Sequence, residues 1–117
     1  GPPPVERAVL PATPALVSRV VGEYRLTEAS REALSGKVPK EIIDSAMGMT
    51  LSADGDRLFM KPSGQQRVRV FLGEGSVLFT KKDPLDLLLE PASAAPVAAI
   101  TLTQGGLSGR YERAPRP

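Results

Sequence analysis

The stretch from Met47 to Glu90 places the strongest constraint on the fold, because short apolar segments alternate there with turn residues. Segments of about five or six residues that return at this interval are typical of an antiparallel meander. The turns that separate them are Asp54-Gly55, Pro62-Ser63-Gly64, Gly73-Glu74-Gly75 and Lys82-Asp83-Pro84. We therefore expect a sheet built from consecutive hairpins.

Further strands are expected on both sides of this stretch, from Gly22 to Leu26, around Ile100 and Leu102, and near Leu107–Arg113. The total is eight strands, each with one apolar face. Eight antiparallel strands close most simply into an up-and-down barrel, which leaves no exposed sheet edge. The sequence predicts this all-β barrel, with a β-sandwich as the second choice because the same alternation would satisfy it.

The apolar positions of these strands define the predicted core. One face of the meander should be buried inside the barrel, where an eight-stranded sheet leaves room for side chains or for one small ligand. The expected buried residues are Met47, Met49, Leu51, Leu58, Met60, Val68, Val70, Val77, Phe79, Leu87, Ile100 and Leu102.

Helical segments are expected at two places. Thr13-Pro14 supplies an N-cap followed by proline at the first helical position, and Gly22 is a candidate left-handed cap at the end of that helix. Residues 27–46 interrupt the β pattern with two short helices, Glu28–Ser35 and Pro39–Ala46. This insertion after the first strand would cover one open end of the barrel. A solvated connection is favoured over a functional lid.

The expected domain organisation is a single barrel domain from residue 13 to residue 113. Residues 1–12 begin Gly1-Pro2-Pro3-Pro4 and are interpreted as a linker or the remnant of an expression tag. Residues 114–117 are expected to form a disordered tail.

Composition argues against most kinds of chemistry. The 117 residues contain no histidine and no cysteine, which removes the commonest general base and the commonest metal ligands. Asp54-Gly55-Asp56 is too short for a calcium loop and is interpreted as a hairpin turn. We predict no catalytic residues, no metal and no cofactor. The net charge of +2 does not favour nucleic acid, and no apolar run is long enough to span a membrane.

The outer face of the hairpin 57–61/67–71 is a candidate docking surface. If Phe59 faces Arg69 across the hairpin, two phenylalanines lie among four cations on a face that should be polar. Such a face could dock a partner, pack locally through cation–π contacts, or stack on bases. Docking or local packing is favoured. The residues concerned are Arg57, Phe59, Lys61, Arg67, Arg69 and Phe71.

The inner face offers a second candidate site. Methionines fill irregular cores, and they also line adaptable apolar pockets. A filled interior is favoured, because a small barrel is normally packed with its own side chains. If the interior is hollow, the expected ligand contacts are Met47, Met49, Met60 and Phe79.

Four segments of the chain, taken in order, resemble one family. They are LVSRVVGEYRL, MTLSADGDRLFMKPSGQ, VLFTKKDPLDLLLEP and ITLTQGGLSGRYER, which together cover Leu16 to Arg113. They are similar to small domains that lie C-terminal to β-lactamase-like serine hydrolases and to some other bacterial secreted or periplasmic enzymes. The resemblance implies a lipocalin-like barrel without catalytic residues of its own, in an extracytoplasmic protein. The insertion at residues 27–46 is longer than this family leads us to expect.

Three functions follow as hypotheses. The first, implied by the resemblance, is an accessory domain that packs on or gates an upstream catalytic domain of the same chain or a protein partner. The second is a stand-alone carrier of a small apolar ligand. The third, disfavoured by the charge balance, is a single-stranded nucleic-acid binder that uses Phe59 and Phe71.

Overall fold

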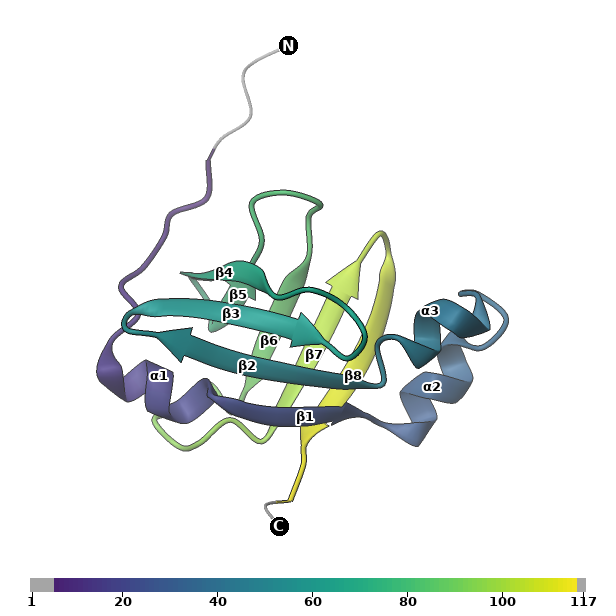
Figure 1. Cartoon of the computed structure of the whole chain (residues 1–117). Helices are drawn as coiled ribbons and strands as arrows, with labels where there is room; N and C mark the ends of the chain where they lie inside the picture. Colours follow the sequence, from purple (N-terminus) through teal and green to yellow (C-terminus); the bar gives the residue numbers. More distant parts are fainter. Residues whose placement is uncertain (1–5, 116–117) are drawn as a thin grey trace.

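The computed structural model describes residues 6–115 and confirms the predicted all-β barrel (Figure 1). Eight antiparallel strands form one closed sheet in the order β1 to β8. Their bounds are β1 Gly22–Leu26, β2 Gly48–Asp54, β3 Arg57–Pro62, β4 Val68–Gly73, β5 Val77–Phe79, β6 Asp86–Glu90, β7 Ala99–Gln104 and β8 Leu107–Arg113.

Each strand pairs with the next strand in sequence, and β1 closes the barrel by pairing with β8. The turn between β2 and β3 is the expected hairpin, with Gly55 at φ 63° between the paired residues Asp54 and Arg57. Glycine adopts such a positive φ without steric cost. Short turns of this kind let the meander return without long loops.

Three short helices lie outside the sheet: α1 Pro14–Val20, α2 Glu28–Leu34 and α3 Lys40–Asp44. Helix α1 lies at one end of the barrel, whereas α2 and α3 lie at the other (Figure 1). The hydroxyl of Thr13 accepts a hydrogen bond from the Leu16 amide at 3.1 Å, so the predicted N-cap is confirmed.

The expected left-handed cap at Gly22 is wrong. Helix α1 ends at Val20, Val21 is extended, and Gly22 already belongs to β1. A Cβ atom on Gly22 would lie 2.2 Å from Nη1 of Arg113. Glycine is favoured here because its φ is 153°, which other residues rarely adopt, and because a Cβ atom would displace the Arg113 guanidinium.

The core fills the part of the barrel nearer to α1. Large side chains with 2% or less of their surface exposed come from most strands and from α1; they include Val20, Tyr24, Leu51, Leu58, Val70, Leu78, Leu87, Leu89 and Ile100. All of these residues belong to one contiguous cluster. The predicted core residues Met49, Leu51, Leu58, Met60, Val70, Leu87 and Ile100 are part of it.

The predicted core needs correction at Val68 and on strand β5. Val68 is 44% exposed, so the expectation that it is buried is wrong. On β5 the inward residue is Leu78, which pairs with Leu72 and Leu87. Val77 and Phe79 consequently alternate to the outer face, where Val77 is only half-buried. Phe79 is 3% exposed, so its predicted burial is confirmed, although it lies outside the barrel interior.

Arg113 closes the α1 end of the barrel. Its guanidinium donates hydrogen bonds to the carbonyls of Val97 at 2.6 Å, Arg19 at 2.8 Å and Val21 at 3.0 Å. It also donates to the hydroxyl of Tyr24 at 2.8 Å and lies over that ring, with Cζ 4.9 Å from the centroid. One side chain thus ties the end of α1, strand β1 and the β6–β7 loop to β8.

Segments next to the barrel are attached to it. The amide of Leu10 donates to the carbonyl of Leu72 at 2.8 Å, and Arg7 forms an ion pair with Asp86 at 2.7 Å. At the other terminus, the amide of Ala114 donates to the carbonyl of Glu23 at 2.8 Å. The remainder of the expected linker and tail, residues 1–5 and 116–117, lies outside the described residues.

Candidate functional site

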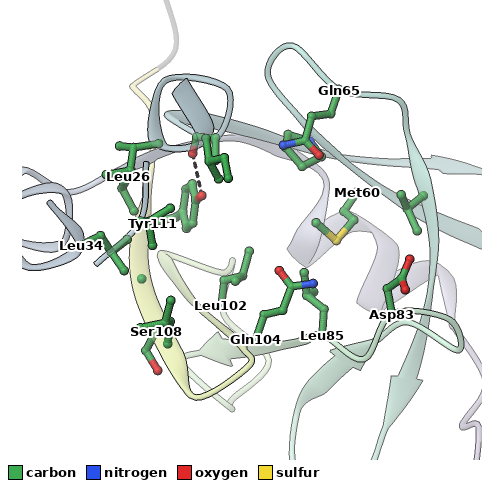
Figure 2. Close-up of a pocket in the computed structure, with 18 of the residues that line it drawn as sticks. Leu26, Leu34, Met60, Gln65, Asp83, Leu85, Leu102, Gln104, Ser108 and Tyr111 are labelled. Carbon is green, nitrogen blue, oxygen red and sulfur yellow. Dashed lines mark hydrogen bonds between the residues drawn. The ribbon is translucent and has the colours of Figure 1, made fainter. Parts of the chain in front are cut away.

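The barrel is hollow at the end that carries α2 and α3. A cavity of about 620 Å³ opens there, with its wall formed by the barrel interior on one side and the 27–46 insertion on the other (Figure 2). This volume falls within the range of about 300–1,000 Å³ that is usual for small-molecule sites. We refer to this cavity as the barrel mouth.

The wall of the barrel mouth is mainly apolar. It includes aliphatic side chains of the strands, such as Leu26, Met60, Val68, Leu85 and Leu102, and of the insertion, namely Leu34, Val38, Ile42 and Ile43. Val68 and Ile42 are 44% and 54% exposed, because they border the open space instead of packing into the core. Val68 therefore lies on the cavity wall and not in the core, where the sequence predicts it.

Polar groups are gathered at the rim and at one side of the cavity. Gln65, Gln104 and Ser108 border it, and so do Lys82 and Asp83 of the β5–β6 loop (Figure 2). Amide and hydroxyl groups in an apolar wall fix the orientation of a ligand through a small number of hydrogen bonds. The mouth therefore has the composition of a site for an apolar molecule with a polar end.

Tyr111 links the insertion to the barrel wall. Its hydroxyl donates a hydrogen bond of 2.6 Å to the carbonyl of Ala46, just after α3 (dashed line in Figure 2). Burial raises the pKa of the Tyr111 hydroxyl to about 12, because the charged phenolate is poorly solvated there. The phenol is thus a neutral donor that holds the insertion in place as a wall of the cavity.

The 27–46 insertion is anchored to β8 as well. The amide of Arg110 donates to the hydroxyl of Ser30 at 2.8 Å, and the amide of Thr27 donates to the carbonyl of Arg110 at 2.9 Å. The sequence favours a solvated connection here. The structure instead places apolar side chains of this segment against the cavity, so the insertion lines the barrel mouth.

A small residue makes room for the cavity. A Cβ atom on Gly109 would lie 3.2 Å from Cδ1 of Leu26 and 3.5 Å from Cδ1 of Leu34. On the neighbouring strand, Ile100 is fully buried, whereas Leu102, two residues nearer the mouth, is half-buried. The filled interior favoured by the sequence thus describes the α1 half of the barrel but not the mouth.

The four predicted interior contacts lie in different places. Met60 lines the barrel mouth, and Met49 is buried in the core cluster. Met47 precedes β2, is half-buried and packs against the core cluster. Phe79 lies on the outer face, opposite Phe71, with the two ring centroids 6.0 Å apart. Sequence reasoning missed most of the wall, because the insertion, two separate loops and the ends of several strands contribute it.

The outer hairpin face has the register that the sequence predicts. Phe59 pairs with Arg69, flanked by Leu58 opposite Val70 and Met60 opposite Val68. Arg67 immediately precedes β4, and Arg57 is the first residue of β3. Both phenylalanines, Phe59 and Phe71, are half-buried.

Cations cover the outward phenylalanines. Cζ of Arg67 lies 3.9 Å from the Phe59 ring centroid, and Cζ of Arg69 lies 4.7 Å from that of Phe71. Nζ of Lys81 lies 4.3 Å from the Phe71 centroid, and Cζ of Arg7 lies 4.2 Å from that of Phe79. The local cation–π packing considered from the sequence is therefore present.

No group of three or more His, Cys, Asp or Glu side chains that could hold a metal ion occurs within residues 6–115. In the same part of the chain, no helix is long and apolar enough to cross a membrane. Comparison with known proteins gives no matching family model, no matching curated protein and no matching solved structure.

Proposed function

We propose that this protein binds a small, predominantly apolar molecule in the barrel mouth. The observation that carries the proposal is the cavity of about 620 Å³, walled by aliphatic side chains at the end of the barrel where α2 and α3 lie. Apolar surface that leaves water on binding supplies the main driving force, at roughly 25 cal/mol per Å². The amides of Gln65 and Gln104 at the rim suit a neutral polar head group such as a hydroxyl.

The test uses a neutral apolar probe. N-phenyl-1-naphthylamine becomes fluorescent in apolar surroundings, and long-chain alcohols can compete with it for the same site. We expect saturable binding to the wild-type chain and displacement that improves with alcohol chain length, because each buried methylene contributes about 0.8 kcal/mol.

A matched pair of substitutions locates the binding site. Leu102→Trp places a larger side chain in the cavity and should weaken probe binding by about tenfold or more, through loss of space. Leu88→Trp makes the same exchange on the outside of the neighbouring strand, where Leu88 is 42% exposed, and should leave binding unchanged. Equal effects of the two substitutions, or no saturable binding by the wild type, would refute the proposal.

The second candidate function is an accessory role next to a catalytic domain, as the family resemblance implies. It is supported by Phe59 and Phe71, which are half-buried on the outside of the barrel, because aromatic side chains are enriched at protein–protein interfaces. The extracytoplasmic location that the resemblance implies belongs to this candidate. Sequencing the complete gene tests it, since a serine-hydrolase domain upstream would favour it and an unrelated upstream region would not.

A further inference from the structure

One face of the barrel carries a concentration of positive charge. Five cations surround Phe59 and Phe71 on the outside of β3, β4 and the adjoining loops; we call this set the cationic outer face, and it consists of Arg57, Lys61, Arg67, Arg69 and Lys81. Arg69 is half-buried and the other four are exposed. These five charges exceed the +2 of the whole chain, so the rest of the molecule is acidic.

These cations form no ion pair within residues 6–115. The ion pairs there are Arg7–Asp86, Arg31–Glu28, Lys40–Asp44 and Arg110–Glu90, and none of them includes a member of the cationic outer face. Asp54 lies opposite Arg57 in the β2–β3 ladder without forming an ion pair with it. Nε of Arg69 is buried and has no hydrogen-bond partner, so it is not among the donors that an external ligand contacts.

The stacking of Arg67 and Arg69 on aromatic rings leaves their hydrogen-bonding edges available. A guanidinium that lies over a ring uses its flat face, and its N–H donors lie within its own plane. In Arg69 the Nε–H is buried, which leaves the two terminal nitrogens as donors to a ligand. That fork matches the two oxygens of a carboxylate. Stacking also holds the side chain in place, so less conformational entropy is lost when a carboxylate binds.

The protein contains one arginine that lies over an aromatic ring and also binds a carboxylate. Arg7 lies over the Phe79 ring at 4.2 Å and donates a hydrogen bond of 2.7 Å to the carboxylate of Asp86. Phe79 and Phe71 are paired neighbours in the sheet. Arg67 over Phe59 and Arg69 over Phe71 repeat the ring and the cation, but no carboxylate accompanies them.

We propose that the cationic outer face binds an extended, carboxylate-rich segment of a protein partner. Arg67 immediately precedes β4 and Arg69 lies on it, so their backbone positions are at most about 7 Å apart. An extended segment that carries acids at alternate positions has the same spacing. This inference does not depend on ligand binding in the barrel mouth, which lies inside the barrel.

Nucleic acid fits this face less well. Bases bind through stacking on free aromatic faces, and here Phe59 and Phe71 are half-buried beneath cations. Acidic residues also border the face, with Asp54 and Asp56 at the β2–β3 turn and Glu74 at the β4–β5 turn. They would repel a phosphate backbone that continued beyond the patch.

The test compares three probes by fluorescence anisotropy. The first is a peptide that alternates glutamate with serine, the second is the same peptide with glutamine in place of glutamate, and the third is a short oligothymidylate. We expect the glutamate peptide to bind more tightly than both others at about 150 mM salt, where screening limits non-specific charge attraction.

Two variants that remove equal charge locate the site. Arg67→Gln/Arg69→Gln should weaken binding of the glutamate peptide by about tenfold or more, because two charge-assisted contacts are lost. Arg25→Gln/Lys37→Gln removes two exposed cations elsewhere and should weaken it by less than about twofold. Lys61→Gln, at an exposed position of the face, should give an intermediate loss in a chain whose fold is undisturbed.

Several results would overturn the proposal. They are equal losses in the two double variants, equal affinity for the glutamate and glutamine peptides, or tighter binding of the oligonucleotide. Failure of the wild type to bind the glutamate peptide at low salt would do the same. Melting temperatures of all variants, measured alongside, separate loss of the site from loss of the fold.

Discussion

Titration of the Tyr111 hydroxyl should be visible in the stability of the fold. It is buried, it donates to the carbonyl of Ala46 at 2.6 Å, and burial raises its pKa from 10.0 to about 12. A pKa that is higher in the folded state means that the unfolded chain loses its proton first as the pH rises. The stabilising contribution of the neutral phenol is therefore complete below about pH 10 and is lost between about pH 10 and pH 12.

The raised pKa of Tyr111 leads to a prediction about stability at high pH. The free energy of unfolding of the wild type should fall between pH 10 and pH 12. The free energy of unfolding of Tyr111→Phe should fall less steeply with pH. A smaller slope should remain because burial also raises the pKa of Tyr24. At neutral pH the substitution should cost about 1 kcal/mol, because the Ala46 carbonyl loses its donor. Urea unfolding at a series of pH values measures both effects, and identical slopes for the two chains would contradict the assignment.

At the scale of single elements, strand β4 carries an internal comparison between its two valines. Val70 is 1% exposed and packs in the core, whereas Val68 is 44% exposed at the barrel mouth. Deleting buried methyl groups costs transfer free energy plus the cost of the cavity that remains. Val68 already borders open space, so its truncation removes few contacts.

We predict that Val70→Ala lowers the free energy of unfolding by ~2–4 kcal/mol, and that Leu58→Ala on the paired strand does the same. Val68→Ala should cost less than about 1 kcal/mol. Chemical denaturation of the three variants gives the comparison directly. A neutral Val70→Ala, or a Val68→Ala of equal cost, would be inconsistent with the register of β3 and β4.

The elements also show how far sequence patterns determine this structure. Alternation on β3 and β4 is unambiguous, and the pairing of Phe59 with Arg69 follows from it. On β5 the run Val77-Leu78-Phe79 is apolar throughout, so alternation cannot decide which residue faces inward. That choice is made by the partners of Leu78 on β4 and β6, which are known only once the strands are in place.

The barrel mouth could not be predicted, for a similar reason. Its wall combines Leu34 and Ile42 of the insertion with Gln65 and Asp83 of two different loops and with Gln104 at the end of β7. No local pattern connects these residues, because their proximity results from the closure of the barrel. The sequence places Tyr111 only within the last strand, although its hydrogen bond to Ala46 fixes one side of the cavity.

At the scale of the whole molecule, the order of the strands bears on how the chain folds. In seven of the eight strand pairs the partners are neighbours in sequence, and β1 with β8 is the exception. Contacts between distant parts of the chain carry the largest loop-closure cost, so they tend to form late in folding. Arg113 on β8 reinforces this late contact by binding carbonyls of Arg19 and Val21.

Arg113→Met, which keeps the apolar stem, should destabilise the fold by about 3 kcal/mol, since three carbonyls and the Tyr24 hydroxyl lose a charged donor. Most of this loss in the free energy of unfolding should come from faster unfolding, because the contact forms after the transition state. The folding rate should change little. Arg110→Met on the same strand breaks only the exposed ion pair with Glu90 and should cost less than about 1 kcal/mol. Stopped-flow measurements of folding and unfolding rates test this prediction. A large drop in the folding rate of Arg113→Met would mean that β1 and β8 pair before the transition state.

The hollow half of the barrel also makes the fold's stability a variable quantity. The aliphatic side chains that line the open space lack van der Waals contacts on the side that faces the cavity. A molecule that occupies the space binds the folded chain and not the unfolded one, so it adds RT ln(1 + [L]/Kd), about 2.7 kcal/mol at a hundredfold excess over Kd. The melting temperature of this protein should therefore report the concentration of whatever fills its mouth.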